Sequence, residues 1–122
     1  MSFGPQTLPF VNENPKVTWK GASGISYDFW LHPIGTIYLA IPGAYIFCKP
    51  ASVSSWNSLY VGETDNFLRR LTNELAAHHR WNGIRAHGAT HICTLVIQGG
   101  NAERLRIETD LRHGLNPPCN RQ

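Results

Sequence analysis

Five side chains of this 122-residue sequence are of the chemical types that hydrolysis of a phosphodiester bond needs: Tyr45, Tyr60, Arg70, Glu108 and Asn120. The reaction requires an activated water, a positive charge on the phosphate and a stabilised leaving oxygen. A lone carboxylate such as Glu108 can anchor Mg²⁺, which keeps most of its own waters. Arg70 can stabilise the negative charge of the transition state. A tyrosine becomes a proton acceptor when a nearby metal and arginine lower its pKa from about 10.

The spacing of these residues is more informative than their types. Each tyrosine stands beside a glycine, in the triplets Gly43-Ala-Tyr45 and Tyr60-Val-Gly62. Arg70 follows the second triplet on a predicted helix, Glu108 lies on a second predicted helix, and the sequence Asn-Pro-Pro-Cys-Asn ends at Asn120. Each element of this pattern is common by itself, whereas the ordered combination is not.

The combination resembles the GIY-YIG nuclease family over Gly43–Asn120, about two-thirds of the chain, with the signature in a Gly-Ala-Tyr and Tyr-Val-Gly variant. The segments LYVGETDNFLRRL and ERLRIETDLRHGLNPPCN are especially typical. The resemblance implies a metal-dependent endonuclease that uses Mg²⁺ or Mn²⁺, held by Glu108, to cleave DNA. It implies that Tyr45 activates the water, that Tyr60 orients the phosphate or the water, and that Asn120 supports the site through hydrogen bonds. The five side chains should then converge on one face of a sheet.

One position departs from the family pattern. Many members carry a histidine or tyrosine one turn after the arginine, where this chain has Glu74. His78, one turn further along, is a possible substitute, although its position near a predicted helix end favours a solvated side chain.

Each candidate also has a purely structural interpretation. Tyr45 and Tyr60 suit ordinary strands, and Arg70 could pair with Glu74 four residues later. Glu108 lies close to the apolar arc of its helix, so it needs a metal or a partner, for which Arg104 is the structural candidate.

The elements that must position these residues follow from periodicity. Val17–Lys20 and Ile25–Leu31 flank Gly21–Gly24 and predict a β-hairpin. Further strands are predicted over 36–41, 44–48, 59–62 and 90–98. Helices are predicted from Asp65 or Asn66 to about His79, stopped by Asn82-Gly83, and over Ala102–Arg112, stopped by Gly114. The fold class is therefore α+β: a small central antiparallel sheet of about three core strands plus an N-terminal hairpin, flanked by helices.

Length and composition predict one domain, with residues 1–42 as an extension whose hairpin completes the sheet and residues 43–122 as the nuclease-like core. The first ten residues lack a basic start, and no apolar stretch is long enough to cross a bilayer, so we expect neither a signal peptide nor a membrane span. Three widely spaced cysteines, Cys48, Cys93 and Cys119, predict small buried side chains in a reducing compartment, hence the cytoplasm.

The formal net charge is +3, and all eight arginines lie in the second half of the chain. We expect Arg69, Arg80 and Lys49 to contact nucleic acid. No second DNA-binding module is visible, so sequence specificity would come from a homodimer or a partner protein. Two other functions stay open: a catalytically inactive nucleic-acid-binding module of the same fold, and a protein-interaction domain.

Overall fold

The computed structural model of the chain describes residues 15–121. The predictions for residues 1–14, an irregular start without a signal peptide, fall outside the described residues. In chain order the strands are β1 (Lys16–Lys20), β2 (Ser26–Pro33), β3 (Gly43–Pro50), β4 (Trp56–Thr64) and β5 (His91–Val96). The helical segments are the π-helical turn η1 (Leu68–Asn73), the 3₁₀ turn η2 (Leu75–Ala77), α1 (Trp81–Ala86), α2 (Asn101–Leu115) and the 3₁₀ turn η3 (Pro118–Asn120).

The five strands form one antiparallel sheet in the order β1-β2-β5-β3-β4. The predicted α+β class is confirmed, with β3, β4 and β5 as core strands and the β1–β2 hairpin joined to them through the pairing of β2 with β5. β3 lies between two strands and is buried on both faces from Gly43 to Cys48, which explains its continuous run of apolar residues. The division of the chain at residue 42 stays a prediction.

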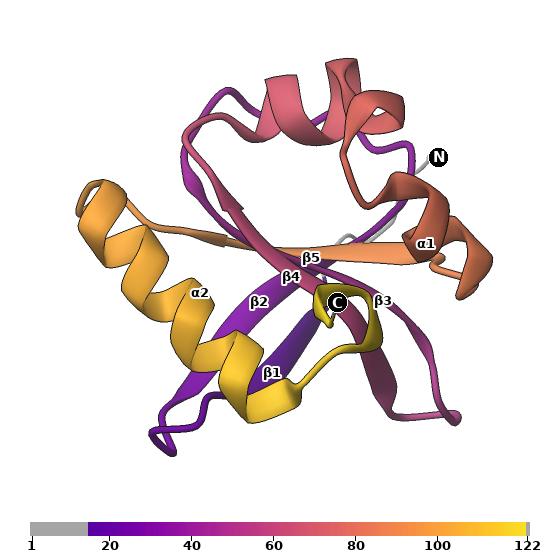
Figure 1. Cartoon of the computed structure of the whole chain (residues 1–122), viewed down its shortest axis with the longest axis horizontal. Helices are drawn as coiled ribbons and strands as arrows, with labels where there is room; N and C mark the ends of the chain where they lie inside the picture. The colour runs from indigo at the N-terminus through magenta and orange to yellow at the C-terminus, as the bar shows by residue number, and fades with distance from the viewer. Residues whose placement is uncertain (1–14, 122) are drawn as a thin grey trace.

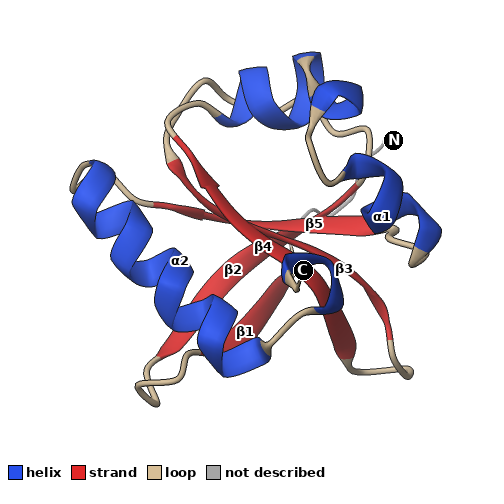
Figure 2. Ribbon diagram, viewed as in Figure 1, coloured by secondary structure: helices blue, strands red, loops and turns tan. Residues whose placement is uncertain are grey.

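Helical segments cover the two faces of the sheet separately (Figures 1 and 2). Under α2, a cluster that includes Phe29, Ile46 and Cys93 packs against Ile107 and Leu111. These two helix residues are buried, as the sequence predicts. On the other face, η1, η2 and α1 cover a second cluster that contains both candidate tyrosines. The three cysteines are buried free thiols.

The predicted strand over 36–41 is wrong. This segment is a loop whose backbone groups bond to η1 and the residues before it instead of to the sheet: Phe67 N–H donates to Ile41 O at 2.9 Å and Leu68 N–H to Leu39 O at 3.1 Å. The Thr72 hydroxyl accepts the Tyr38 N–H at 3.1 Å. The loop is therefore fastened to the segment that carries Arg70.

The continuous helix predicted from Asp65 to His79 is also wrong. The Glu74 N–H bonds to Arg69 O at 2.8 Å, five residues back, and Glu74 itself leaves the helical region with φ −118° and ψ 25°. His78 is extended, with φ −60° and ψ 129°, which turns the chain back toward the sheet. Helix α1 then forms over Asn82-Gly83, where the sequence predicts a stop, because Trp81 and Ile84 pack on the Phe47 side of the sheet.

Helix α2 continues past Gly114 and ends at Asn116, which takes the left-handed conformation with φ 47°. A side chain at Gly114 would meet the backbone of the β1–β2 turn, with Ala22 N at 2.5 Å from an added Cβ. Gly114 therefore serves a close approach between α2 and the hairpin instead of stopping the helix. Within residues 15–121, none of the helices has both the length and the apolar character needed to span a bilayer.

Candidate active site

Tyr45 and Tyr60 lie on the same face of the sheet, on adjacent strands. In the β3–β4 ladder Tyr45 pairs with Gly62 and Phe47 pairs with Tyr60, so both rings belong to the cluster opposite α2. Their ring centroids are 6.2 Å apart. The register shifts just after this pair, because Phe47 faces Tyr60 while Cys48 faces Ser58. Such a bulge re-aims side chains at the edge of a sheet.

The glycine of the second triplet makes room for the first tyrosine. A Cβ built on Gly62 would lie 2.5 Å from both Cζ and Oη of Tyr45. The phenol ring therefore lies across the backbone of β4 at this residue. The glycine of the second triplet is thus required by the packing of the tyrosine of the first.

His78 lies beside both tyrosines. Its Nε2 is 2.8 Å from the Tyr45 hydroxyl, and its ring packs edge-on against Tyr60 with centroids 5.1 Å apart. The side chain is only 3% exposed, so the interpretation of His78 as a solvated helix end is wrong. Sequence spacing could not find this contact, because it depends on the break between η1 and α1.

The hydrogen bonds of His78 define its tautomer. The Arg80 N–H donates to Nδ1 at 3.1 Å, so this nitrogen is an acceptor. Burial and the positive charge of Arg70 lower the pKa of His78 to about 4, so the ring is neutral near pH 7. In a neutral imidazole the other nitrogen then carries the proton. His78 Nε2–H therefore donates to the oxygen of Tyr45.

Both tyrosines are protonated in the structure. Burial raises the pKa of Tyr45 above its ordinary value; the neighbouring Tyr60 phenol adds to this effect, and the Arg70 guanidinium opposes it. Burial and the carboxylate of Glu108 likewise raise the pKa of Tyr60, against Arg70, Arg80 and Arg112. The sequence predicts that an arginine lowers the tyrosine pKa. Without a metal or substrate, burial of the phenols outweighs that effect.

Arg70 faces a polar cleft of about 330 Å³ between the end of β4, η1 and the start of α2. Its guanidinium lies 3.4 Å from His79 Nδ1, and within the described residues it forms no ion pair. The partner expected for it, Glu74, instead lies 3.9 Å from Arg69. Arg70 is thus a cation near both tyrosines with no carboxylate bound to it.

Glu108 lies on α2, which packs against the edge strand β4. Its side chain is 14% exposed, and Oε2 accepts a hydrogen bond from Arg112 Nε at 3.2 Å. Arg104, the expected structural partner, bonds instead to Glu63 at 2.9 Å and ties α2 to β4. The negative charge of Glu108 contributes to the raised pKa of Tyr60.

Asn120 fixes the C-terminal turn to β4. Its Oδ1 accepts the Val61 N–H at 2.7 Å and its Nδ2 donates to Val61 O at 3.0 Å. Both polar atoms of the side-chain amide thereby bond to the backbone of Val61, the residue between Tyr60 and Gly62. Asn120 therefore fastens the second triplet to the C-terminal turn, and its role in a reaction stays a prediction.

The three residues expected to contact nucleic acid line three different depressions, and the contact itself stays a prediction. Arg69 lines the same cleft as Arg70. Arg80 lines a second depression, of about 300 Å³, between α1 and η3. Lys49 lines a third, of about 440 Å³, and its Nζ donates to His87 O at 2.8 Å.

Glu108 is the carboxylate that the sequence pattern assigns to a divalent cation, while Glu63 and Asp65 line the cleft beside Arg70. Within residues 15–121, no three His, Cys, Asp or Glu side chains come together in a metal-binding cluster. Mg²⁺ is commonly held by one or two carboxylates, with waters and substrate phosphates as its other ligands. Glu108, whose side chain is largely buried, could supply a carboxylate of this kind.

The fold is similar to that of a solved GIY-YIG domain. The structure of the GIY-YIG N-terminal endonuclease domain of UvrC from Thermotoga maritima is that of a tyrosine-to-phenylalanine point mutant bound to its catalytic divalent cation. It matches with a TM-score of 0.55 and 22% sequence identity, over 69% of this chain and 87% of that chain. No protein-family model and no curated protein matches this chain. The likeness establishes a GIY-YIG-like fold.

Proposed function

We propose that this protein is a metal-dependent endonuclease that hydrolyses DNA phosphodiester bonds. The observation that carries the proposal is the buried group of Tyr45, Tyr60 and His78 on one face of the sheet, with Arg70 and Glu108 among the charges that shift the pKa of Tyr60. The structural similarity to an endonuclease domain that holds a catalytic divalent cation supports the same reaction class.

Arg70 is the proposed charge clamp. It has no ion-pair partner within the described residues, and it lies close enough to Tyr45 and Tyr60 to shift the pKa of both. A guanidinium in this setting can form two parallel hydrogen bonds with a phosphate, and its charge then stabilises the transition state. Tyr60 would orient the phosphate or the attacking water.

Tyr45 is the proposed proton acceptor. The phenolate must form before it can take a proton from water, and burial disfavours that charge. The hydrogen bond from His78 Nε2–H and the positive charge of Arg70 both favour the phenolate over the phenol. His78 would thus take the place of the auxiliary group missing at Glu74, not as a base but as a hydrogen-bond donor.

Glu108 is the proposed ligand of Mg²⁺ or Mn²⁺. A bound divalent ion supplies positive charge next to the scissile phosphate. Arg112 also competes for Glu108, since its Nε lies 3.2 Å from Oε2. This ion pair is the observation that favours the second candidate, a nucleic-acid-binding module of the same fold without catalysis.

Cleavage of supercoiled plasmid DNA with Mg²⁺ or Mn²⁺, against an EDTA control, separates the two functions. We expect nicking that requires the cation and that falls by about 10²–10³-fold or more in Glu108→Gln, because the carboxylate that holds the ion is lost. Glu103→Gln is the matched control, since Glu103 lies on the same helix and pairs only with exposed Arg106.

Two outcomes would contradict the proposal. DNA binding without cation-dependent cleavage would leave the inactive module as the function, and equal rates in Glu108→Gln and wild type would remove Glu108 as the metal ligand. A homodimer or a partner protein that supplies specificity, and a cytoplasmic location, stay predictions.

A further inference from the structure

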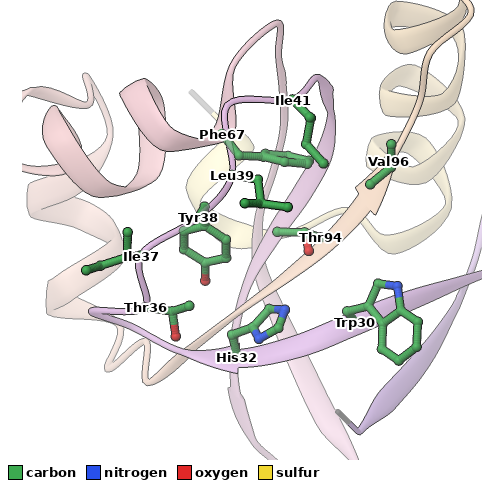
Figure 3. Close-up of a pocket in the computed structure, with 10 residues that line it drawn as sticks. All are labelled: Trp30, His32, Thr36, Ile37, Tyr38, Leu39, Ile41, Phe67, Thr94 and Val96. Atoms are coloured by element: carbon green, nitrogen blue, oxygen red, sulfur yellow. The ribbon is translucent and has the colours of Figure 1, made fainter. Parts of the chain in front are cut away.

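A groove of about 270 Å³ lies on the sheet face opposite α2, between β2, β5 and the 34–42 loop (Figure 3). Four of the seven large apolar side chains that are exposed within the described residues line it: Trp30, Ile37, Leu39 and Val96. Single exposed apolar residues are ordinary, but a cluster around a groove indicates a binding surface.

The groove presents aromatic rings with a cation beside them. Trp30, His32, Tyr38 and Phe67 line it, and the rings of His32 and Tyr38 meet edge-on with centroids 5.6 Å apart. The ammonium of Lys16, the cross-strand partner of Trp30, lies over the indole, 4.8 Å from the ring centroid. Lys16 forms no ion pair with any described residue. An uncompensated positive charge therefore stands at the Trp30 side of the groove.

The hydroxyl of Tyr38 is an unused donor in the wall of the groove. Tyr38 is 7% exposed, and its oxygen is buried without a hydrogen-bond partner among residues 15–121. Figure 3 shows this oxygen directed between Thr36 and His32, and the Thr36 hydroxyl itself donates to Pro33 O at 2.8 Å. Burial raises the pKa of Tyr38, so the hydroxyl keeps its proton. Such a donor is unfavourable until a ligand brings an acceptor to it.

The groove adjoins the cleft that contains Arg70. The segment around the start of η1 borders both, because Phe67 lines the groove while Arg69 and Arg70 line the cleft. The connection from β5 to α2 borders both as well, with Val96 in the groove and Asn101 in the cleft. A nucleic-acid strand whose phosphates lie in the cleft would therefore pass next to the groove.

Building on the proposed function, we propose that the groove binds an unpaired base of single-stranded DNA. The base would pack against Trp30 and Leu39 and offer an acceptor to the Tyr38 hydroxyl, while its phosphate would lie near Lys16. Every base has a π-face and a polar edge that carries acceptors, so such binding tolerates any sequence. The substrate class that follows is DNA that is single-stranded or opened beside the cleaved bond.

A purely apolar occupant, such as an apolar peptide, accounts for fewer of these observations. Apolar side chains stack on the rings, but they offer no acceptor to Tyr38 and no negative charge to Lys16. A nucleotide supplies the ring, the acceptor and the charge together.

Binding of an oligothymidylate and of an abasic oligonucleotide of the same length tests the proposal, with EDTA present so that no cleavage is needed. The two probes carry the same phosphates, and only the first carries bases. We expect Trp30→Ala to weaken binding of the oligothymidylate by about 5–150-fold, the usual value of one base–aromatic stack, and to leave binding of the abasic probe unchanged. Lys16→Met should lower the slope of log K against log salt by about one for both probes.

Tyr38→Phe has a readout that a merely structural tyrosine would not give. Removal of a buried hydroxyl without a partner should keep or raise the melting temperature of the free protein. The same change should weaken binding of the oligothymidylate by about 2–10-fold, the net value of one hydrogen bond. A lower melting temperature with unchanged binding would remove Tyr38 from the site and overturn the assigned contact.

Leu39→Asp and Val53→Asp form a matched pair in case Trp30→Ala does not fold. Each change adds one negative charge at an exposed apolar residue, and only Leu39, which is 71% exposed, lines the groove. We expect Leu39→Asp to weaken binding of the oligothymidylate roughly tenfold more than Val53→Asp does, because the charge lies where the base stacks. Matching melting curves of the two variants confirm that both are folded.

Three results would overturn the proposal. They are equal affinity of the wild type for the two probes, unchanged oligothymidylate binding in Trp30→Ala and Leu39→Asp, or a dimer in sedimentation that Leu39→Asp dissociates and the oligothymidylate does not. The last result would make a second copy the occupant. Failure of the nuclease is a separate outcome: plasmid DNA that stays intact would reject the proposed cleavage, whereas nicking by a protein that binds both probes equally would reject the base site alone.

Discussion

Tyr45 and His78 form the buried pair on which the proposed chemistry depends. The imidazole accepts the Arg80 N–H at Nδ1 and donates from Nε2 to the phenol oxygen, 2.8 Å away. A donor aimed at this oxygen stabilises the phenolate more than the phenol, because the phenolate carries the full negative charge. The pair thus lowers the energy of the form that accepts a proton.

Tyr45→Phe keeps the ring packing and removes the oxygen. We expect single-turnover cleavage to slow by about 10²–10⁴-fold, the usual contribution of a general base. Since burial raises the pKa of Tyr45, the wild-type rate should rise with pH without a plateau below about pH 10, and this rise should flatten in the variant. Tyr27→Phe, which removes a hydroxyl bonded to Asp110, is the control and should keep the full rate.

The stability of the fold should depend on pH through His78. The folded pKa is about 4, below the ordinary 6.5, so the unfolded chain binds this proton first. The free energy of unfolding should therefore fall by up to about 3 kcal/mol as the pH drops from about 6.5 to 4. Below about pH 4 it should level off, because the histidine is then protonated in both states. The groups around the ring are Tyr45, Tyr60, Arg70, His79 and Arg80.

Urea titrations at a series of pH values measure this dependence. His78→Gln keeps a side-chain N–H donor but cannot titrate, so the wild-type curve minus the variant curve isolates the histidine. A variant with the full wild-type slope would assign the dependence to His32, His79 or His91, whose pKa values burial also lowers.

Among the elements, strand β4 combines an edge position with two special backbone features. Its register shifts after Tyr60, and its Gly62 accommodates the ring of Tyr45. Asn120 then holds the strand from the other side through both polar groups of Val61. The tyrosines are positioned by these three restraints together.

Gly62→Ala should destabilise the protein by about 1–3 kcal/mol, because the added Cβ would lie 2.5 Å from Tyr45 Cζ and the core must shift. The cleavage rate should fall by more than the increase in unfolded protein explains, because the added methyl displaces the Tyr45 ring. In Gly83→Ala, on α1, the new methyl meets nothing within 4 Å, so we expect stabilisation of about 0.5–1 kcal/mol. Thermal denaturation of both variants checks the contrast, and equal melting temperatures would refute it.

Across the whole molecule, Arg69 and Arg70 line one cleft, Arg80 lines a second depression and Lys49 a third. A nucleic-acid strand bound to these cations would release about one counterion for each phosphate that they contact. This arrangement predicts affinity that falls steeply with salt and varies little with sequence.

Salt titrations in the Glu108→Gln background measure this binding without cleavage. Arg69→Ala, Arg80→Ala and Lys49→Ala should each reduce the slope of log K against log salt by about one. Lys20→Ala, at the end of β1 and outside these depressions, should leave the slope unchanged. A slope that Lys20→Ala reduces as much as Arg80→Ala would contradict the assigned surface.

The local elements with strong periodic patterns could be predicted from the sequence. The β1–β2 hairpin forms where apolar and polar residues alternate. Strand β3 forms over a continuous apolar run, and helix α2 forms where apolar residues recur every three or four positions. Their apolar faces have the same period as the backbone that carries them, so each segment selects its own structure. The GIY-YIG-like fold is confirmed for the same reason, because it is an arrangement of these elements.

The tertiary structure decided what happens between Asp65 and Ala86. The Phe67, Leu71 and Leu75 stripe favours one helix, yet the chain breaks at Glu74 and again at His78, and restarts across Asn82-Gly83. Packing of Trp81 and Ile84 on the sheet outweighs local helix propensity there, which amounts to only about 1 kcal/mol per residue. The same break brings His78 to Tyr45, a contact between residues 33 positions apart that no local spacing encodes.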